Sequence, residues 1–126
     1  MFVTRIYQFN NKNHKIISVA DFDFSKVQIV IFATEENISA EYVPKATAAG
    51  GVVIDNSSAF RQEDDIPLVV ADINADLISD YSKRKIIASL SSISGLILIA
   101  LNSLHQAADV IRIHISTYQS VSDYDK

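Results

Sequence analysis

The sequence predicts an α/β fold with a mainly parallel β-sheet and an N-terminal β-hairpin. Two short runs, VQIVIFA and VVIDNS, are almost continuously apolar and β-branched, which is typical of parallel strands buried on both faces. Segments with helical spacing follow these runs, and strands that alternate with helices indicate a parallel α/β sheet. The 126 residues with 48% apolar content are enough for one core, so we expect a single domain over residues 1–126.

The first half of the chain contains a hairpin, a loop, a strand and a helix. FVTRIYQFN and HKIISVA are expected to pair around a polar NKN turn, and DFDFSK forms a loop before the strand VQIVIFA. Helical spacing from Ile38 to Ala49 places Tyr42, Val43 and Ala46 on one side. Ser39 is expected to cap this helix, and Gly50-Gly51 is expected to end it.

The second half repeats the pattern of strand and helix. VVIDNS and KIIAS are predicted strands, SAFRQEDDIP is a loop, LVVADIN is short and extended, and ADLISDYS is a short helix. A helix is expected to begin at Ser91 or Ser92, to end near Ala108, and to be buried. The alternating run VIRIHISTYQSV predicts a half-exposed strand, and SDYDK a frayed tail.

Composition excludes several classes of function. The net charge is −4, and the longest basic run is Lys83-Arg84-Lys85, which is more simply interpreted as a solvated turn. Because phosphate binding needs clustered basic residues, we expect no nucleic-acid partner. The absence of cysteine excludes disulfides and thiolate chemistry, and it is compatible with a cytoplasmic location. The most apolar window, Ile93 to Leu104, is about half the ~20 residues that a membrane span needs, so no membrane role is expected.

Polar segments end four of the predicted strands. They read ATEEN, DNSSAFR, ASLSS and STYQS. Ligands of parallel α/β sheets bind at the carboxyl ends of the strands. If the chain has a site, the sequence places it there.

These strand ends resemble one family. From about Phe22 to Ser122, the segments VVIDNSSAFR, DIPLVVADIN, KIIASLSSIS and STYQSVS resemble the aspartate-semialdehyde dehydrogenases, and most of all their Usg-type paralogues. The resemblance implies a Rossmann-like, NAD(P)-binding-like domain from an enzyme that reduces aspartyl phosphate with NADPH. It also implies a truncated member, because the family's opening glycine-loop strand and its second domain have no counterpart here.

The resemblance places Ser92 at the family's nucleophile position, where relatives carry cysteine. A thiolate is stabilised at a helix N-terminus, whereas a serine hydroxyl there needs a general base. The asparagine-proline-asparagine that precedes the family's cysteine is replaced by Ser89, Leu90 and Ser91. The simpler alternative is that Ser91 or Ser92 is only a helix cap.

The resemblance implies a weakened cofactor site. Glu35 and Glu36 stand where the family has small residues and glycines beside NADPH, and their charge would oppose its pyrophosphate, although they are also ordinary loop residues. Asn56, Ser57 and Ser58 match the family's polar cluster near the cofactor. Ser122 begins a segment in which acids and a tyrosine replace the family's glycines. We therefore expect no cofactor, with NADP implied by the resemblance alone.

Arg61 matches the arginine that holds the substrate phosphate, but an ion pair with the neighbouring acids is the alternative. His105 and His114 are interpreted as structural.

The predicted function is that of a catalytically inactive relative of the dehydrogenase. The alternative is an interaction or dimerising module with a residual phosphate or NADP site, which forms a homo-oligomer or associates with a full-length relative.

Overall fold

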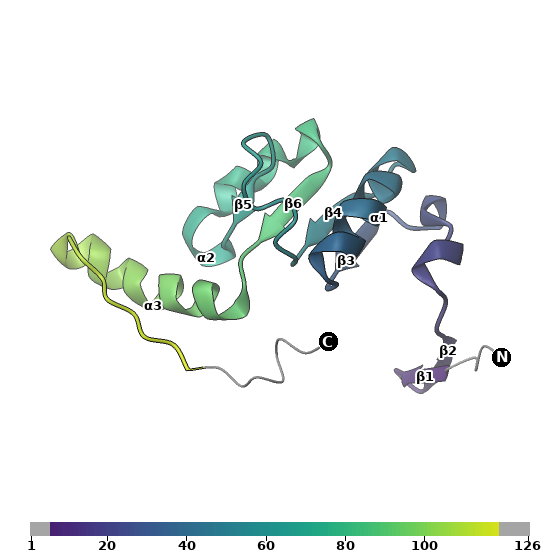
Figure 1. Ribbon diagram of the computed structural model, residues 1–126, viewed down its shortest axis with the longest axis horizontal. Coiled ribbons are helices and arrows are strands. Elements are labelled where there is room, and N and C mark those ends of the chain that lie inside the picture. The colour runs from purple at the N-terminus through teal and green to yellow at the C-terminus, as the bar shows by residue number, and fades with distance from the viewer. Residues whose placement is uncertain (1–5, 119–126) are drawn as a thin grey trace.

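The computed structural model describes residues 6–118, which are built around a four-stranded parallel sheet (Figure 1). The strand order is β3-β4-β6-β5, and all three pairings are parallel. This confirms the predicted α/β class. The strands are β3 (Ile29–Phe32), β4 (Val52–Asp55), β5 (Leu68–Val69) and β6 (Ile86–Ser89).

The predicted hairpin is also confirmed, with a tighter turn than expected. β1 (Ile6–Phe9) pairs antiparallel with β2 (Lys12–Lys15). Asn10 and Asn11 have positive φ angles of 50° and 59° and form the two-residue turn, because asparagine tolerates the left-handed region that such turns require. The expected NKN tip is therefore shifted by one residue, and the hairpin is exposed throughout.

The helices differ from expectation mainly where they begin. α1 (Glu36–Ala48) starts two residues earlier than predicted and has Glu35 as its N-cap, so the prediction that Ser39 caps it was wrong. The end is confirmed, since Gly50 adopts a φ of +102° that other residues rarely reach. The remaining helical elements are the 3₁₀ turns η1 (Val19–Asp21) and η2 (Phe24–Lys26), the short α2 (Ala71–Asn74), the 3₁₀ segment η3 (Ala75–Lys83) and α3 (Ser92–Ala108).

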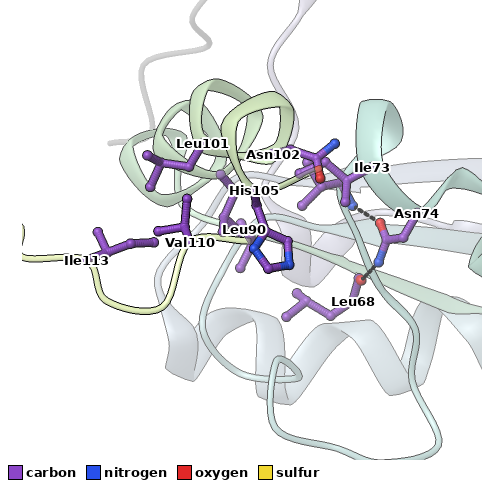
Figure 2. Close-up of a pocket in the computed structure, with 11 residues that line it drawn as sticks. Leu68, Ile73, Asn74, Leu90, Leu101, Asn102, His105, Val110 and Ile113 are labelled. Carbon is purple, nitrogen blue, oxygen red and sulfur yellow. Dashed lines mark hydrogen bonds between the residues drawn. The ribbon is translucent and has the colours of Figure 1, made fainter. Parts of the chain in front are cut away.

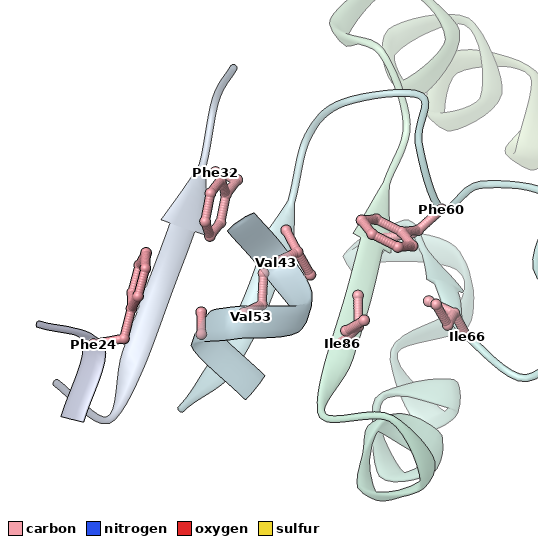
Figure 3. Packing of buried hydrophobic residues seen from close by; sticks show 9 residues of the cluster. Phe24, Phe32, Val43, Val53, Phe60, Ile66 and Ile86 are labelled. Carbon is pink, nitrogen blue, oxygen red and sulfur yellow. The ribbon is translucent and has the colours of Figure 1, made fainter. Parts of the chain in front are cut away.

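The core lies on one face of the sheet, as Figure 3 shows. Phe32 and Val53 point from the strands toward Val43 of α1, and Phe24 of η2 packs beside Phe32 with ring centroids 6.3 Å apart. Farther along the sheet, Ile86 lies beneath side chains of the loop that follows β4, namely Phe60 and Ile66.

The opposite face of the sheet is uncovered at β3. Ile29 is 64% exposed and Ile31 is 71% exposed. The prediction that this strand is buried on both faces was therefore wrong. The reason is that β3 is an edge of the described sheet and α1 packs only on the face of Phe32.

Two predictions for the C-terminal third were also wrong. No residue of α3 is buried, and Leu96 is 69% exposed, so the helix is not the core helix that its apolar stripe indicated. Residues 110–118 form no strand, because a strand needs a hydrogen-bonded neighbour and this segment pairs with none of the described strands. It runs instead beside α3, away from the sheet (Figure 1). Among the described helices, none has the length and apolar character to cross a membrane.

Candidate functional site at the strand ends

The centre of the strand-end region is the fully buried carboxylate of Asp55, the last residue of β4. Ser39 donates a hydrogen bond to Oδ1 over 2.7 Å, and Ser57 donates to Oδ2 over 2.6 Å. Ser39 also shares a hydrogen bond of 2.9 Å with Thr34. A buried carboxylate needs such donors, so this network ties α1 and the loop after β4 to the sheet.

Asn56 and Ser58, two of the predicted cofactor residues, lie exposed at the same edge and contact neighbouring elements. The Asn56 side-chain oxygen accepts a hydrogen bond of 2.8 Å from Ser89, which ends β6. The Ser58 hydroxyl donates to Glu36 over 2.7 Å. The structure therefore brings three of the four predicted strand ends together. Ser57, by contrast, is 7% exposed and is directed at Asp55.

Arg61 links two strand ends through their backbone. Its Nε donates to the Ser89 carbonyl over 2.9 Å, and one terminal nitrogen donates to the Asn56 carbonyl over 2.8 Å. It forms no ion pair with the acids beside it within the described region, and Asp65 pairs with Arg84 over 2.9 Å, so the ion-pair alternative was wrong. Two of the five guanidinium N–H groups hold the loop, and the phosphate role stays a prediction.

Ser91 and Ser92 form the start of α3. Ser91 is the N-cap, and its Oγ accepts a hydrogen bond of 3.3 Å from the Ser94 amide. Ser92 is the first helical residue and is exposed. The groove beside it is lined by serines, glycine and aliphatic side chains of the described chain, with no acid or histidine among them. His105 lies thirteen positions along the same helix, ~20 Å away at 1.5 Å per residue, too far to act as a base.

The start of α1 does not fit the pyrophosphate of a dinucleotide. Glu35 is the N-cap and Glu36 occupies the first turn, where their negative charges interact favourably with the positive end of the helix dipole. The same charges occupy the position at which a phosphate would meet the helix N-terminus. The side-chain oxygen of Glu36 also holds Ser58, so a predicted cofactor ligand is engaged with a carboxylate.

The remaining predicted residues contribute little to this site. Ser122 lies outside the described residues. His114 is exposed on the segment after α3, and His105 lies far from Ser92. Within residues 6–118, no cluster of three or more acids and histidines could hold a metal ion.

A pocket of about 300 Å³ lies between α3, the α2 region and residues 110–113 (Figure 2). His105 and Asn102 face it from α3, and Leu68 and Asn74 form the opposite wall. Both polar atoms of Asn74 are engaged, because its side chain accepts from the Val70 amide over 2.7 Å and donates to the Leu68 carbonyl over 3.0 Å. Asn74 therefore stabilises the end of β5.

Sequence reasoning missed the network around Asp55. The sequence predicts a helix cap at Ser39, and it marks Thr34 only as one of the polar residues in ATEEN at the end of a predicted strand. The one available signal was the aspartate at the end of a run otherwise fit for burial, VVID, because a buried carboxylate requires partners elsewhere in the chain.

Comparison with known proteins identifies the fold and its family. The family described as "Semialdehyde dehydrogenase, NAD binding domain" matches residues 3–81. The aspartate-semialdehyde dehydrogenase of Legionella pneumophila is 43% identical over 124 residues, which is 98% of this chain and 36% of that protein. The chain belongs to the aspartate-semialdehyde dehydrogenase family.

Two Vibrio cholerae proteins extend the match. Aspartate-semialdehyde dehydrogenase 2 is 41% identical over 97% of this chain and 36% of its own length. The crystal structure of aspartate semialdehyde dehydrogenase II superposes with a TM-score of 0.89 at 41% identity, over 95% of this chain and 36% of that chain. The chain thus spans just over a third of the length of these dehydrogenases. The likeness begins earlier than Phe22, and the Usg-type likeness stays a prediction.

Proposed function

We propose that this chain is a domain of the NAD-binding type that does not carry out the dehydrogenase reaction of its family by itself. The observation that carries the proposal is that Ser92, which the resemblance matches to the family's nucleophile, is an exposed serine at the first position of α3. A hydroxyl at a helix N-terminus stays protonated at neutral pH, so it needs a base within hydrogen-bond reach. The groove beside Ser92 offers only serines, glycine and apolar groups among its described residues.

The surroundings of α1 support the cofactor part of the proposal. Glu35 and Glu36 place two carboxylates where a pyrophosphate would approach, and Ser58 is bound to one of them. We infer that NADP, which the family implies, is held weakly or not at all by this chain alone. The cytoplasm remains the predicted location.

The test is NADPH formation from aspartate semialdehyde, NADP and phosphate. The purified chain and its Ser92→Ala variant are expected to give the same background rate. A rate of the wild-type chain clearly above that of Ser92→Ala would overturn the proposal. Titration calorimetry with NADPH and with phosphate tests the residual anion site, for which saturable heat that disappears in Arg61→Gln would be evidence.

A second proposed function is an interaction module, favoured by the uncovered apolar face of the sheet. Ile29 and Ile31 are mostly exposed, although parallel sheets are normally covered on both faces. Their exposed surface is a candidate for contact with another polypeptide, whether a second copy or a full-length relative. Concentration-dependent self-association, or binding to a purified full-length dehydrogenase, would support this role. A chain that stays monomeric and does not bind such a relative would exclude it.

A further inference from the structure

Glu36 and Ser58 connect the carboxyl ends of two neighbouring strands. β3 and β4 run parallel, so they end at the same edge of the sheet. Glu36 begins α1 shortly after β3 ends, and Ser58 lies in the loop that follows β4. Their side chains meet in a hydrogen bond of 2.7 Å, between residues 22 positions apart in the chain. The contact therefore lies at the edge where parallel sheets bind their ligands.

The groups around this contact are those that bind an anion. The first helical hydrogen bond of α1 runs from the Ser39 amide to the Glu35 carbonyl, so the amides of Glu36 and Asn37 have no partner within the helix. Such amides bind phosphate oxygens, and a serine hydroxyl adds one more donor. The Ser58 hydroxyl, however, has a single proton and donates it to Glu36. A phosphate would have to displace that carboxylate.

The charge of Glu36 is not compensated by a cation within residues 6–118. The three ion pairs of this region join Lys26 to Asp23, Lys45 to Glu41 and Arg84 to Asp65. Neither Glu35 nor Glu36 belongs to one of them. A carboxylate that keeps its full charge within a few ångströms of a phosphate lowers the affinity for that phosphate on the order of 10- to 100-fold, with solvent screening included.

The framework on both sides of the contact is held independently of it. Ser39 of α1 and Ser57 of the loop after β4 both donate to the buried carboxylate of Asp55. Glu36 and Ser58 are exposed and bond to each other, outside this network. Loss of the Glu36 carboxylate should therefore leave the first amides of α1 and the Ser58 hydroxyl in place.

We propose that Glu36 is an internal substitute for a ligand phosphate, and that its carboxylate keeps an anion position between α1 and the loop after β4 closed rather than destroyed. Of the two acids, Glu36 is the closing group because it bonds across to the loop, whereas Glu35 makes no side-chain capping bond. The ligand class is a diphosphate, free or within a dinucleotide. The inference rests on the proposed weak binding of NADP and identifies the contact responsible for it.

Titration with pyrophosphate tests the closure, followed by NMR because the amide signals of Asn37 and Ser58 report binding at this position. Glu36→Ala is expected to lower the dissociation constant of pyrophosphate at least about tenfold relative to the wild-type chain. Glu35→Gln and Glu41→Gln change the net charge equally and are expected to lower it less than about threefold. Adding Ser58→Ala to Glu36→Ala is expected to remove most of the gain, because the released hydroxyl is then absent.

Two further arms complete the experiment. Glu36→Gln removes the charge but keeps an oxygen that can accept from Ser58, so it is expected to give a smaller gain, and it replaces Glu36→Ala if circular dichroism shows that the alanine variant does not fold. The same titration with NADP identifies the source of the diphosphate. A gain with pyrophosphate alone supports a site for a free diphosphate, and an equal gain with NADP supports one for a dinucleotide.

The outcomes separate this inference from the proposed function. A gain under about threefold in Glu36→Ala, an equal gain in Glu35→Gln or Glu41→Gln, or a gain that survives Ser58→Ala would overturn the closure, while the proposed lack of dehydrogenase activity would stand. A wild-type chain that already binds NADP with a Kd below about 10 µM would overturn the closure and the proposed weak cofactor binding together.

Discussion

The buried network around Asp55 gives the sharpest stability prediction. Ser39→Ala removes the hydroxyl that donates to the Asp55 carboxylate over 2.7 Å in a site where both residues are fully buried. Loss of a hydrogen bond to a charged group costs about 1.5–3 kcal/mol, and alanine returns ~0.5 kcal/mol through its better helix propensity. The free energy of unfolding should therefore fall by about 1–2.5 kcal/mol, which lowers the Tm by roughly 4–10 °C.

The matched control is Ser25→Ala. Ser25 also donates to an aspartate, Asp23, over 2.6 Å, but this pair is exposed. An exposed bond of this kind exchanges readily for water, so the expected cost is below ~0.5 kcal/mol. Urea denaturation followed by circular dichroism measures both variants. If Ser39→Ala costs no more than Ser25→Ala, the network does not stabilise the strand ends as argued.

Three other predictions concern the loop, the cap and one titration. Arg61→Gln removes bonds to two carbonyls and should cost about 1–3 kcal/mol by urea denaturation, whereas a destabilisation under 0.5 kcal/mol would refute the linking role. Ser91→Ala should cost ~1 kcal/mol and Ser92→Ala almost nothing, and equal losses would contradict the assignment of the cap. Hydrogen bonds from Ser25, chiefly from its hydroxyl, lower the pKa of Asp23 below its ordinary 3.8. The ionised Asp23 side chain therefore stabilises the fold at pH values above its ordinary pKa, and this stabilisation is lost as the pH falls through the lowered pKa. In an NMR titration, Ser25→Ala should raise that pKa, and an unchanged midpoint would contradict this.

The sequence predicted the elements whose signals are local. The apolar runs at β4 and β6 became the central strands, and the serines before the last helix became its cap, because burial in a central strand and capping depend on nearby residues. A similar apolar run at β3 led to the wrong prediction that this strand is buried on both faces. Burial of its second face depends on a neighbouring element that the described part of the chain does not supply. The strand predicted at residues 110–118 was wrong for the same reason. An alternating pattern specifies which residues share a face of a strand, but it does not specify which strand pairs with it.

The candidate site was predicted in location but not in its bonding. The polar segments after β3, β4 and β6 do meet at one edge of the sheet. Which of them would be used for internal bonds could not be read from the sequence. Ser57 is directed at Asp55, and Arg61 at two carbonyls, because the loop after β4 folds back over the sheet.

The central claim is that the turn at the start of α3 has kept the family's shape while losing its chemistry. The most direct measurement is the pH dependence of alkylation of the thiol in Ser92→Cys, compared with Ser103→Cys on the same helix. If the helix N-terminus retains its field, the thiol at position 92 should ionise at least about half a pKa unit lower. Equal pKa values for the two thiols would contradict the retained shape, and NADPH formation by the wild-type chain above that of Ser92→Ala would contradict the lost chemistry.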